Sequence, residues 1–198
     1  MKHFTLRLSA TGLLVTLLAA CSIAPPQAVH LYQLSPQAGA SQTAGLNSSI
    51  GIGPLKWPDY LNRRQLVIRL DAGSIETAEN DRWAEPLDAG FERVLRDNLV
   101  RQLNPQRLQS HPWPLNDAPA IHVPLEVLQF DTSAQGTTVL RARWRIVGRD
   151  RKELLGERGS EIRVQARDGS PPAAVAAQSE ALARLSEEIG KGLLAAAK

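Results

Sequence analysis

One strand sets the strongest constraint on the fold of this chain. Between Thr138 and Val147 every second residue is apolar: Leu140, Ala142, Trp144 and Ile146. The positions between them carry Arg141, Arg143 and Arg145. This alternation predicts a β-strand with one face in the core and the other in solvent. After a charged turn at 150–152 the alternation returns over 157–166, so the two segments together predict a long antiparallel hairpin.

Four further segments predict strands, and two predict helices. The strands are expected at 30–34, 49–54, 65–71 and 120–131. Pro124 in the last of these favours an edge strand or a bulge. The first helix is expected to open at Glu85-Pro86, with an apolar stripe that includes Leu87, Phe91, Val94, Leu95, Leu99 and Leu103, and to end at Asn104-Pro105. The second follows Pro171-Pro172, and its stripe comprises Val175, Leu182, Leu185, Ile189 and Leu193.

The order of these elements predicts an α+β domain. We expect a mainly antiparallel sheet of about five to six strands, with both amphipathic helices packed on one face. One or two parallel neighbours are compatible with this order where a helix makes the crossover, and the strand order stays open. Residues 29–198 are long enough for a single compact domain with a sizeable core.

The N-terminus has the layout of a secretory signal that ends at the only cysteine, Cys21. Two basic residues, Lys2 and Arg7, precede an apolar stretch of about 11 residues, too short for the roughly 20 that span a bilayer. Leu-Ala-Ala directly before Cys21 resembles a bacterial lipobox, in which that thiol is acylated and residues 1–20 are removed. The alternative is an ordinary signal peptide with an accidental cysteine. Residues 21–28 then form a lipidated tether, and Ser22 after the cysteine favours sorting to the outer membrane.

Composition excludes several function classes. Removal of residues 1–20 takes away Lys2 and Arg7 and lowers the net charge from +3 to +1, which leaves no case for nucleic-acid binding. The chain contains no phosphate-binding glycine loop, no HExxH and no GxSxG motif. His30, His111 and His122 share no metal-ligand spacing. We therefore expect no catalytic residues, no metal and no cofactor other than the covalent lipid on Cys21.

The arginine row formed by Arg141, Arg143 and Arg145 is the most suggestive charge pattern. Alternate residues of a strand share one face at about 6.6–6.8 Å spacing, so these three could bind acidic partner residues or phospholipid headgroups. The alternative is a solvated face whose arginines pair across the hairpin with Glu157 and Glu161.

Two clusters of aromatic residues with proline form a second candidate surface. Their members Trp57, Pro58, Tyr60, Leu61 and Trp83 could contact a partner, because rigid aromatic side chains often anchor interfaces. The alternative is that they cap the core, since large aromatic side chains tend to be buried. A third cluster, around Trp113, is expected to cap the core.

These clusters resemble the PqiC (YmbA) family, the auxiliary lipoproteins of MCE-type transport systems. The similarity rests on Trp57-Pro58-Asp59-Tyr60-Leu61 and Trp83-Ala84-Glu85-Pro86-Leu87 with a strand between them, and extends to the lipobox and to residues 30–34. It implies a non-enzymatic lipoprotein on the periplasmic side of the outer membrane. Its implied partners are a PqiB-like MCE-domain protein or other MCE ABC transporter components, and outer-membrane phospholipid.

The resemblance also implies a role in intermembrane phospholipid transport and in membrane integrity. Because MCE proteins form rings, the resemblance also points to a matching homo-oligomer. Two other functions stay open at this point. One is a periplasmic carrier that holds a lipid in its own apolar cavity, and the other is an envelope hydrolase, which would need a serine within reach of a histidine.

Overall fold

The computed structural model describes residues 28–37 and 45–197, so Cys21 and the predicted signal and tether up to residue 27 lie outside the described residues. Eight strands and two α-helices follow one another with two short 3-10 helices: β1 (His30–Tyr32), β2 (Ser49–Lys56), η1 (Asp59–Leu61), β3 (Gln65–Arg69), β4 (Ile75–Trp83), α2 (Leu87–Leu103), β5 (Arg107–Ser110), η2 (Leu115–Asp117), β6 (Ile121–Ser133), β7 (Thr137–Gly148), β8 (Glu153–Gln165) and α3 (Pro171–Ala196).

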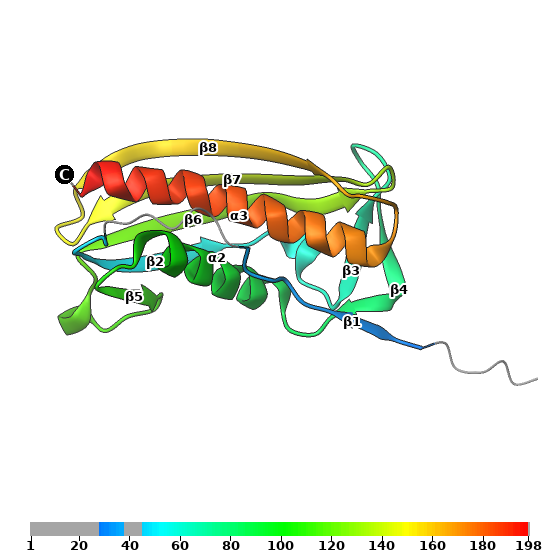
Figure 1. The fold of residues 1–198 in the computed structure, drawn as a ribbon, viewed down its shortest axis with the longest axis horizontal. Helices are drawn as coiled ribbons and strands as arrows, with labels where there is room; N and C mark the ends of the chain where they lie inside the picture. Colours follow the sequence, from blue (N-terminus) through cyan, green and yellow to red (C-terminus); the bar gives the residue numbers. More distant parts are fainter. Residues whose placement is uncertain (1–27, 38–44, 198) are drawn as a thin grey trace, which may run out of the picture.

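The predicted hairpin is the centre of the sheet. β7 pairs antiparallel with β6 on one side and with β8 on the other, and the three long strands run the length of the molecule (Figure 1). Along β7 the apolar positions from Leu140 to Ile146 are buried and the three arginines are exposed, as the alternation predicts. Burial of one whole face thus fixes the register of this hairpin.

The sheet is mixed rather than mainly antiparallel. Its order is β1-β4-β3-β6-β2-β5, with β7 and β8 added on the other side of β6. The pairs β1–β4, β2–β5, β2–β6 and β3–β6 are parallel. The α+β class is confirmed, but β4 and β5 add strands that the sequence did not predict. β4 is mostly polar and β5 has four residues, so neither shows a clear apolar alternation.

Pro124 does not mark an edge strand. β6 lies inside the sheet, with β7 on one side and with β2 and β3 successively on the other. Pro124 instead faces an irregularity in β2, where the register shifts between Ile52 and Leu55. Gly53 at this point has φ of 110°, which favours glycine. Pro124 has no N–H that could donate to β2, and the irregularity of β2 lies opposite this proline.

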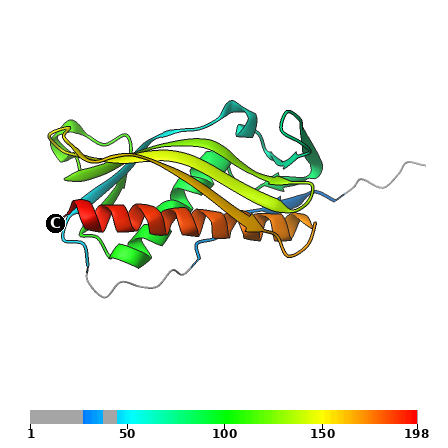
Figure 2. The ribbon, with the colours of Figure 1, turned by 90° about the horizontal axis from the view of Figure 1, so that it is seen from above.

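Both helices cover the same face of the sheet (Figure 2). The stripe of α2 from Leu87 to Leu103 is buried, and so is the stripe of α3 from Val175 to Leu193, as predicted. Between the helices, Asn98 Nδ2 donates to Ser186 Oγ at 3.2 Å. Asn104 ends α2 in the left-handed conformation, with φ of 40°, and Pro105 follows it.

The molecule is elongated, and its two ends differ. β1, the β6–β7 turn and the loop from β8 to α3 lie at one end, whereas the β7–β8 turn, η2 and the end of α3 lie at the other (Figures 1 and 2). The chain therefore enters the domain at the end opposite to the β7–β8 turn. Among residues 28–37 and 45–197, no helix combines the length and the hydropathy needed to cross a bilayer.

Candidate functional site

The aromatic cluster at residues 57–61 joins β2 to β3 and packs inward. The Trp57 ring packs edge-on against two phenylalanines: its centre lies 5.3 Å from the ring centre of Phe91 in α2 and 6.3 Å from that of Phe130 in β6. Leu61 and Trp83 are 2% and 4% exposed. The aromatic rings thus fill the space where α2 meets the sheet, and this packing supports the core-capping alternative for them.

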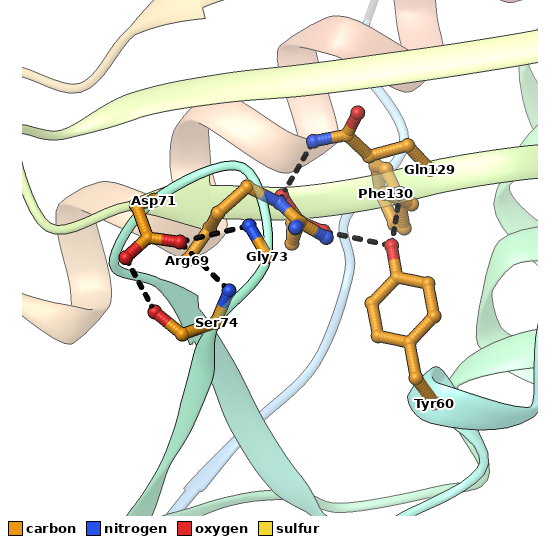
Figure 3. A network of polar contacts seen from close by, with 8 residues as sticks. Tyr60, Arg69, Asp71, Gly73, Ser74, Gln129 and Phe130 are labelled. Carbon is orange, nitrogen blue, oxygen red and sulfur yellow. Dashed lines mark hydrogen bonds and ion pairs between the residues drawn. The ribbon is translucent and has the colours of Figure 1, made fainter.

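Tyr60 takes part in a buried polar network around Asp131. The Asp131 carboxylate, 1% exposed, accepts two hydrogen bonds from Arg69, at 2.9 Å from Nε and 2.6 Å from Nη2. It also accepts one from Tyr60 Oη at 2.7 Å and one from Gln129 Nε2 at 2.8 Å. The network joins η1, β3 and β6 (Figure 3). Its four hydrogen bonds compensate for removing the charge of Asp131 from water.

The surroundings keep Tyr60 protonated and Arg69 charged. Burial, followed by the hydrogen bond to Asp131, raises the pKa of Tyr60 to about 12. The hydrogen bond to Asp131 also raises the pKa of Arg69, whose guanidinium carbon lies 5.6 Å from the centre of the Tyr60 ring. Tyr60 therefore remains a donor and Arg69 a cation throughout the physiological pH range. This arrangement suits structural support rather than proton transfer.

A contact role for Trp57, Pro58, Tyr60, Leu61 and Trp83 stays a prediction. Pro58 is half-buried, and Asp59 beside it is exposed at the surface of η1. A partner that touches this segment would meet mainly its outer edge, because Leu61 and Trp83 are enclosed by the core.

Sequence reasoning missed Asp131 and Gln129 as site residues. In the predicted strand at 120–131 the odd-numbered residues face the core, and Ile121, Val123, Leu125 and Val127 are indeed buried. The register to β7 then shifts between Val127 and Gln129, so that Phe130 takes the core position opposite Leu140. Gln129 and Asp131 are polar but occupy odd-numbered positions, which face the core earlier in the strand, and the apolar Phe130 lies between them. This change in the alternation is the signal that could have revealed the bulge.

The arginine row is exposed on the helix-free face. Arg141 stands opposite Glu161 and Arg143 opposite Gly159 in the β7–β8 pairing. Glu161, however, forms its ion pair with Arg163, at 2.6 Å. Within residues 28–37 and 45–197, no ion pair closer than 4.0 Å includes Arg141, Arg143 or Arg145. Of the alternative, a solvated face with cross-strand pairs to Glu157 and Glu161, only the solvated face is observed in the described chain, since the three arginines are exposed and unpaired.

The histidines do not assemble a metal or hydrolase site in the part of the chain that the structure describes. His30 lies 3.3 Å from Asp81 near the start of β1. His111 and His122 flank Trp113, with ring centres 5.1 Å and 5.5 Å from it. No hydrogen bond of the described residues joins either imidazole to a serine, and these residues hold no group of three or more potential metal ligands.

A small apolar cavity of about 290 Å³ lies between β3, the β6–β7 turn and the start of α3. Leu66, Ile68, Leu70 and Pro171 contribute to its wall. Gln178 also lines it, and the Oε1 atom of this buried side chain accepts no hydrogen bond. The sequence indicated no surplus of apolar positions for such a cavity, so its presence keeps the carrier alternative open.

Comparison with known proteins supports the family resemblance. Residues 32–190 match a family described as the ABC-type transport auxiliary lipoprotein component. The crystal structure of an uncharacterized protein has a TM-score of 0.69 and 21% identity, over 83% of this chain and 98% of that one. Protein XCC0632 from Xanthomonas campestris also has a TM-score of 0.69, with 13% identity over 83% and 95% of the two chains.

No curated protein shows a significant sequence match. The two structural similarities establish the fold, whereas the family match establishes relatedness over most of the chain. This protein therefore belongs to the family of ABC-type transport auxiliary lipoprotein components.

Proposed function

We propose that this transport-associated lipoprotein is a non-enzymatic docking subunit at the periplasmic side of the outer membrane. Lipid on Cys21 would hold it there, and its partner would be the periplasm-spanning MCE protein of an intermembrane phospholipid transport system. Membership in a transport auxiliary family supports the general class. The lipobox and Ser22 support the location, and the resemblance to PqiC supports the MCE partner.

The observation that carries the docking role is the arginine row. Arg141, Arg143 and Arg145 are exposed and lie on the sheet face that the helices leave uncovered. A cation without an ion pair has no desolvation penalty while it stays in solvent. It also attracts an acidic partner and raises the rate of association. We therefore expect the MCE protein to present acidic side chains to this row.

The shape of the domain suits this geometry. The seven residues 22–28 reach at most about 23 Å from an acylated Cys21. The chain enters the domain at the β1 end, and the arginine row leads from the middle of β7 towards the opposite end. An anchored molecule would thus present the row away from its own attachment point, where a protein that crosses the periplasm could meet it.

Co-purification tests this proposal. The lipid-anchored protein should retain the MCE protein at low salt and lose it as the ionic strength rises, because exposed charge pairs are screened. Arg141→Gln with Arg143→Gln should weaken the association, and Cys21→Ser should release the protein from the membrane. No association, together with normal membrane permeability in a deletion strain, would contradict the docking role.

We also expect a homo-oligomer that matches the ring of an MCE protein. Symmetric rings bind one another most simply when their axes coincide. Light scattering on the detergent-solubilised lipoprotein would give the subunit number. A monomer at the concentrations of the co-purification would contradict this expectation.

The apolar cavity supports a second candidate function, that of a lipid carrier. At about 290 Å³ it stands at the lower limit of pockets that hold drug-sized ligands, about 300–1,000 Å³. A phospholipid with two acyl chains would have to leave most of its apolar surface outside. Mass spectrometry of lipid extracted from the Cys21→Ser protein tests this candidate: one phospholipid per chain would support it, and none would exclude it.

A further inference from the structure

A second cavity, of about 590 Å³, lies at the end of the molecule opposite to β1. We call it the basic cup. Six of its lining residues bear on ligand chemistry: His111, Trp113, His122, Arg145, Arg149 and Arg151. They come from the segment between β5 and β6, from β6 itself, and from β7 and the turn that follows it. The β6–β7 pairing brings these distant parts of the sequence together, with His122 opposite Val147.

Two glycines of β2 shape the wall of the basic cup. A Cβ atom on Gly51 would lie 2.8 Å from the Trp113 ring, and one on Gly53 would lie 2.7 Å from Cβ of His111. Only glycine lets the 111–113 segment lie this close to β2. The indole is then held between two imidazoles, 5.1 Å from His111 and 5.5 Å from His122. The wall is therefore a defined aromatic surface and not a loose loop.

The charge inside the basic cup is strongly unbalanced. Glu153 is the one carboxylate among the described residues that line it, against three arginines. None of these arginines forms an ion pair within 4.0 Å in the described chain. Outside the lining, Asp117 is bound to Arg107, and the field of Arg149 acts with Arg107 to lower the pKa of Asp117. The three guanidinium groups of the cup thus have no ion-pair partner within 4.0 Å in the described chain.

Apolar surface borders these cations. Leu115, at the rim, is 96% exposed, and Val147 and the Trp113 ring lie in the wall. An exposed leucine next to unpaired arginines favours a ligand that combines an anionic group with an organic part. Arginine offers donors in a planar fork that matches phosphate and carboxylate oxygens, and three arginines suit a group with several charged oxygens.

We propose that the basic cup binds the phosphate group of a phosphate ester, with the organic part of the ligand against Trp113 and Leu115. A concave site of about 590 Å³ fits a small molecule or a lipid headgroup better than a flat protein surface. The ligand is thus a soluble phosphate ester or the headgroup of a phospholipid. This inference does not depend on the MCE partner of the proposed function.

Isothermal titration of the full-length lipoprotein in a non-ionic detergent tests the proposal. The probes are inorganic phosphate, glycerol 3-phosphate and dihexanoyl phosphatidic acid. We expect binding of the phosphate esters, and a loss of affinity of at least about tenfold when Arg145→Gln and Arg149→Gln are combined. Arg141→Gln is the matched control, because Arg141 lies on the same face of the same strand but does not line the cup.

The probes distinguish the two sources of the phosphate. Tighter binding of dihexanoyl phosphatidic acid than of glycerol 3-phosphate indicates a lipid headgroup, and equal binding indicates a soluble ester. Gly51→Val provides a second route, because it should displace Trp113 and weaken both esters while circular dichroism shows the fold retained. No binding of any phosphate probe at about 10 mM would overturn the proposal. A glutamate-rich peptide that binds more tightly than both esters and is lost in Arg149→Gln would do the same, because Arg149 lines the cup and is not part of the arginine row. An equal loss of ester affinity in Arg141→Gln would also overturn the proposal.

Discussion

The molecule uses arginine in two opposite ways. Arg69 is mostly buried and gives two hydrogen bonds to Asp131, which accepts two more from Tyr60 and Gln129. Arg141, Arg143 and Arg145, together with Arg149 and Arg151, are exposed and form no ion pair within the described chain. Both groups lie on or beside the same sheet.

The difference separates structure from recognition. A buried ion pair with all its hydrogen bonds satisfied fixes the position of its neighbours, and losing one partner leaves a charge in a low-dielectric site. An exposed cation adds little to stability and is free to meet an external anion. The fold should therefore depend on Asp131 and tolerate changes in the arginine row, whereas binding should show the reverse order.

The largest effect is expected for Asp131→Asn. The substitution leaves the Arg69 cation without its counter-charge, so it should lower the free energy of unfolding by about 3 kcal/mol. Urea unfolding of the purified protein measures this. Asp97→Asn serves as the control, since the Asp97 side chain is 47% exposed and its carboxylate lies 4.0 Å from Arg93 Nη1. This control should change the free energy of unfolding by less than about 0.5 kcal/mol. Equal losses of stability in Asp131→Asn and Asp97→Asn would show that the network around Asp131 is no more important for the fold than a surface ion pair.

A smaller effect is expected for Tyr60→Phe. The ring and its packing stay, but Asp131 loses the hydrogen bond from Tyr60 Oη, which should cost about 1–3 kcal/mol of stability. Partner binding should change little, because the hydroxyl points into the network and not to solvent (Figure 3). If co-purification with the MCE protein falls while the urea midpoint stays constant, the segment is a contact surface after all.

A still smaller effect concerns His122 in the basic cup. Burial, followed by the charges of Arg145 and His111, lowers the pKa of His122 below 6.5. Between the two pKa values the unfolded chain binds more protons than the folded one, so His122 costs stability as the pH falls below about 6.5. Unfolding at pH 8 and pH 5.5 should thus show a smaller loss in His122→Gln than in the wild type. An identical loss would show that the cup does not disfavour the imidazolium.

The smallest effect on stability is expected for Arg141→Gln combined with Arg143→Gln. Exposed side chains without ion pairs should change the free energy of unfolding by no more than about 0.5 kcal/mol. The same double variant should reduce partner association at low salt. A large drop in the urea midpoint would mean that these arginines are structural, and unchanged association would mean that the face is only solvated.

The sequence predicted the elements that bury one whole face. The 138–166 hairpin and both helices carry apolar residues at a regular period, so burial alone fixes where they lie. β4 and β5 escaped prediction because one is polar and the other is short, and their parallel partners are distant in sequence. The bulge at 127–129 moves the core-facing positions of β6 from odd-numbered to even-numbered residues. The simple alternation therefore did not predict the position of Asp131.

The local sequence pattern was enough to predict the arginine row but not the basic cup. The outward direction of the arginine row follows from its period of two. The basic cup combines residues 111–122 with 145–151, which only the β6–β7 register brings together. Trp113, expected to cap the core, lies instead on the wall of this cup against Gly51.

Photo-cross-linking in living cells tests the docking surface most directly. A photoreactive amino acid replaces Arg143 on the helix-free face or, as the control, Glu187 on the exposed side of α3. We predict a cross-link to an MCE-domain protein, identified by mass spectrometry, from position 143 and none from position 187. A cross-link to that protein from position 187 alone, or from neither position, would contradict a docking role for the arginine row.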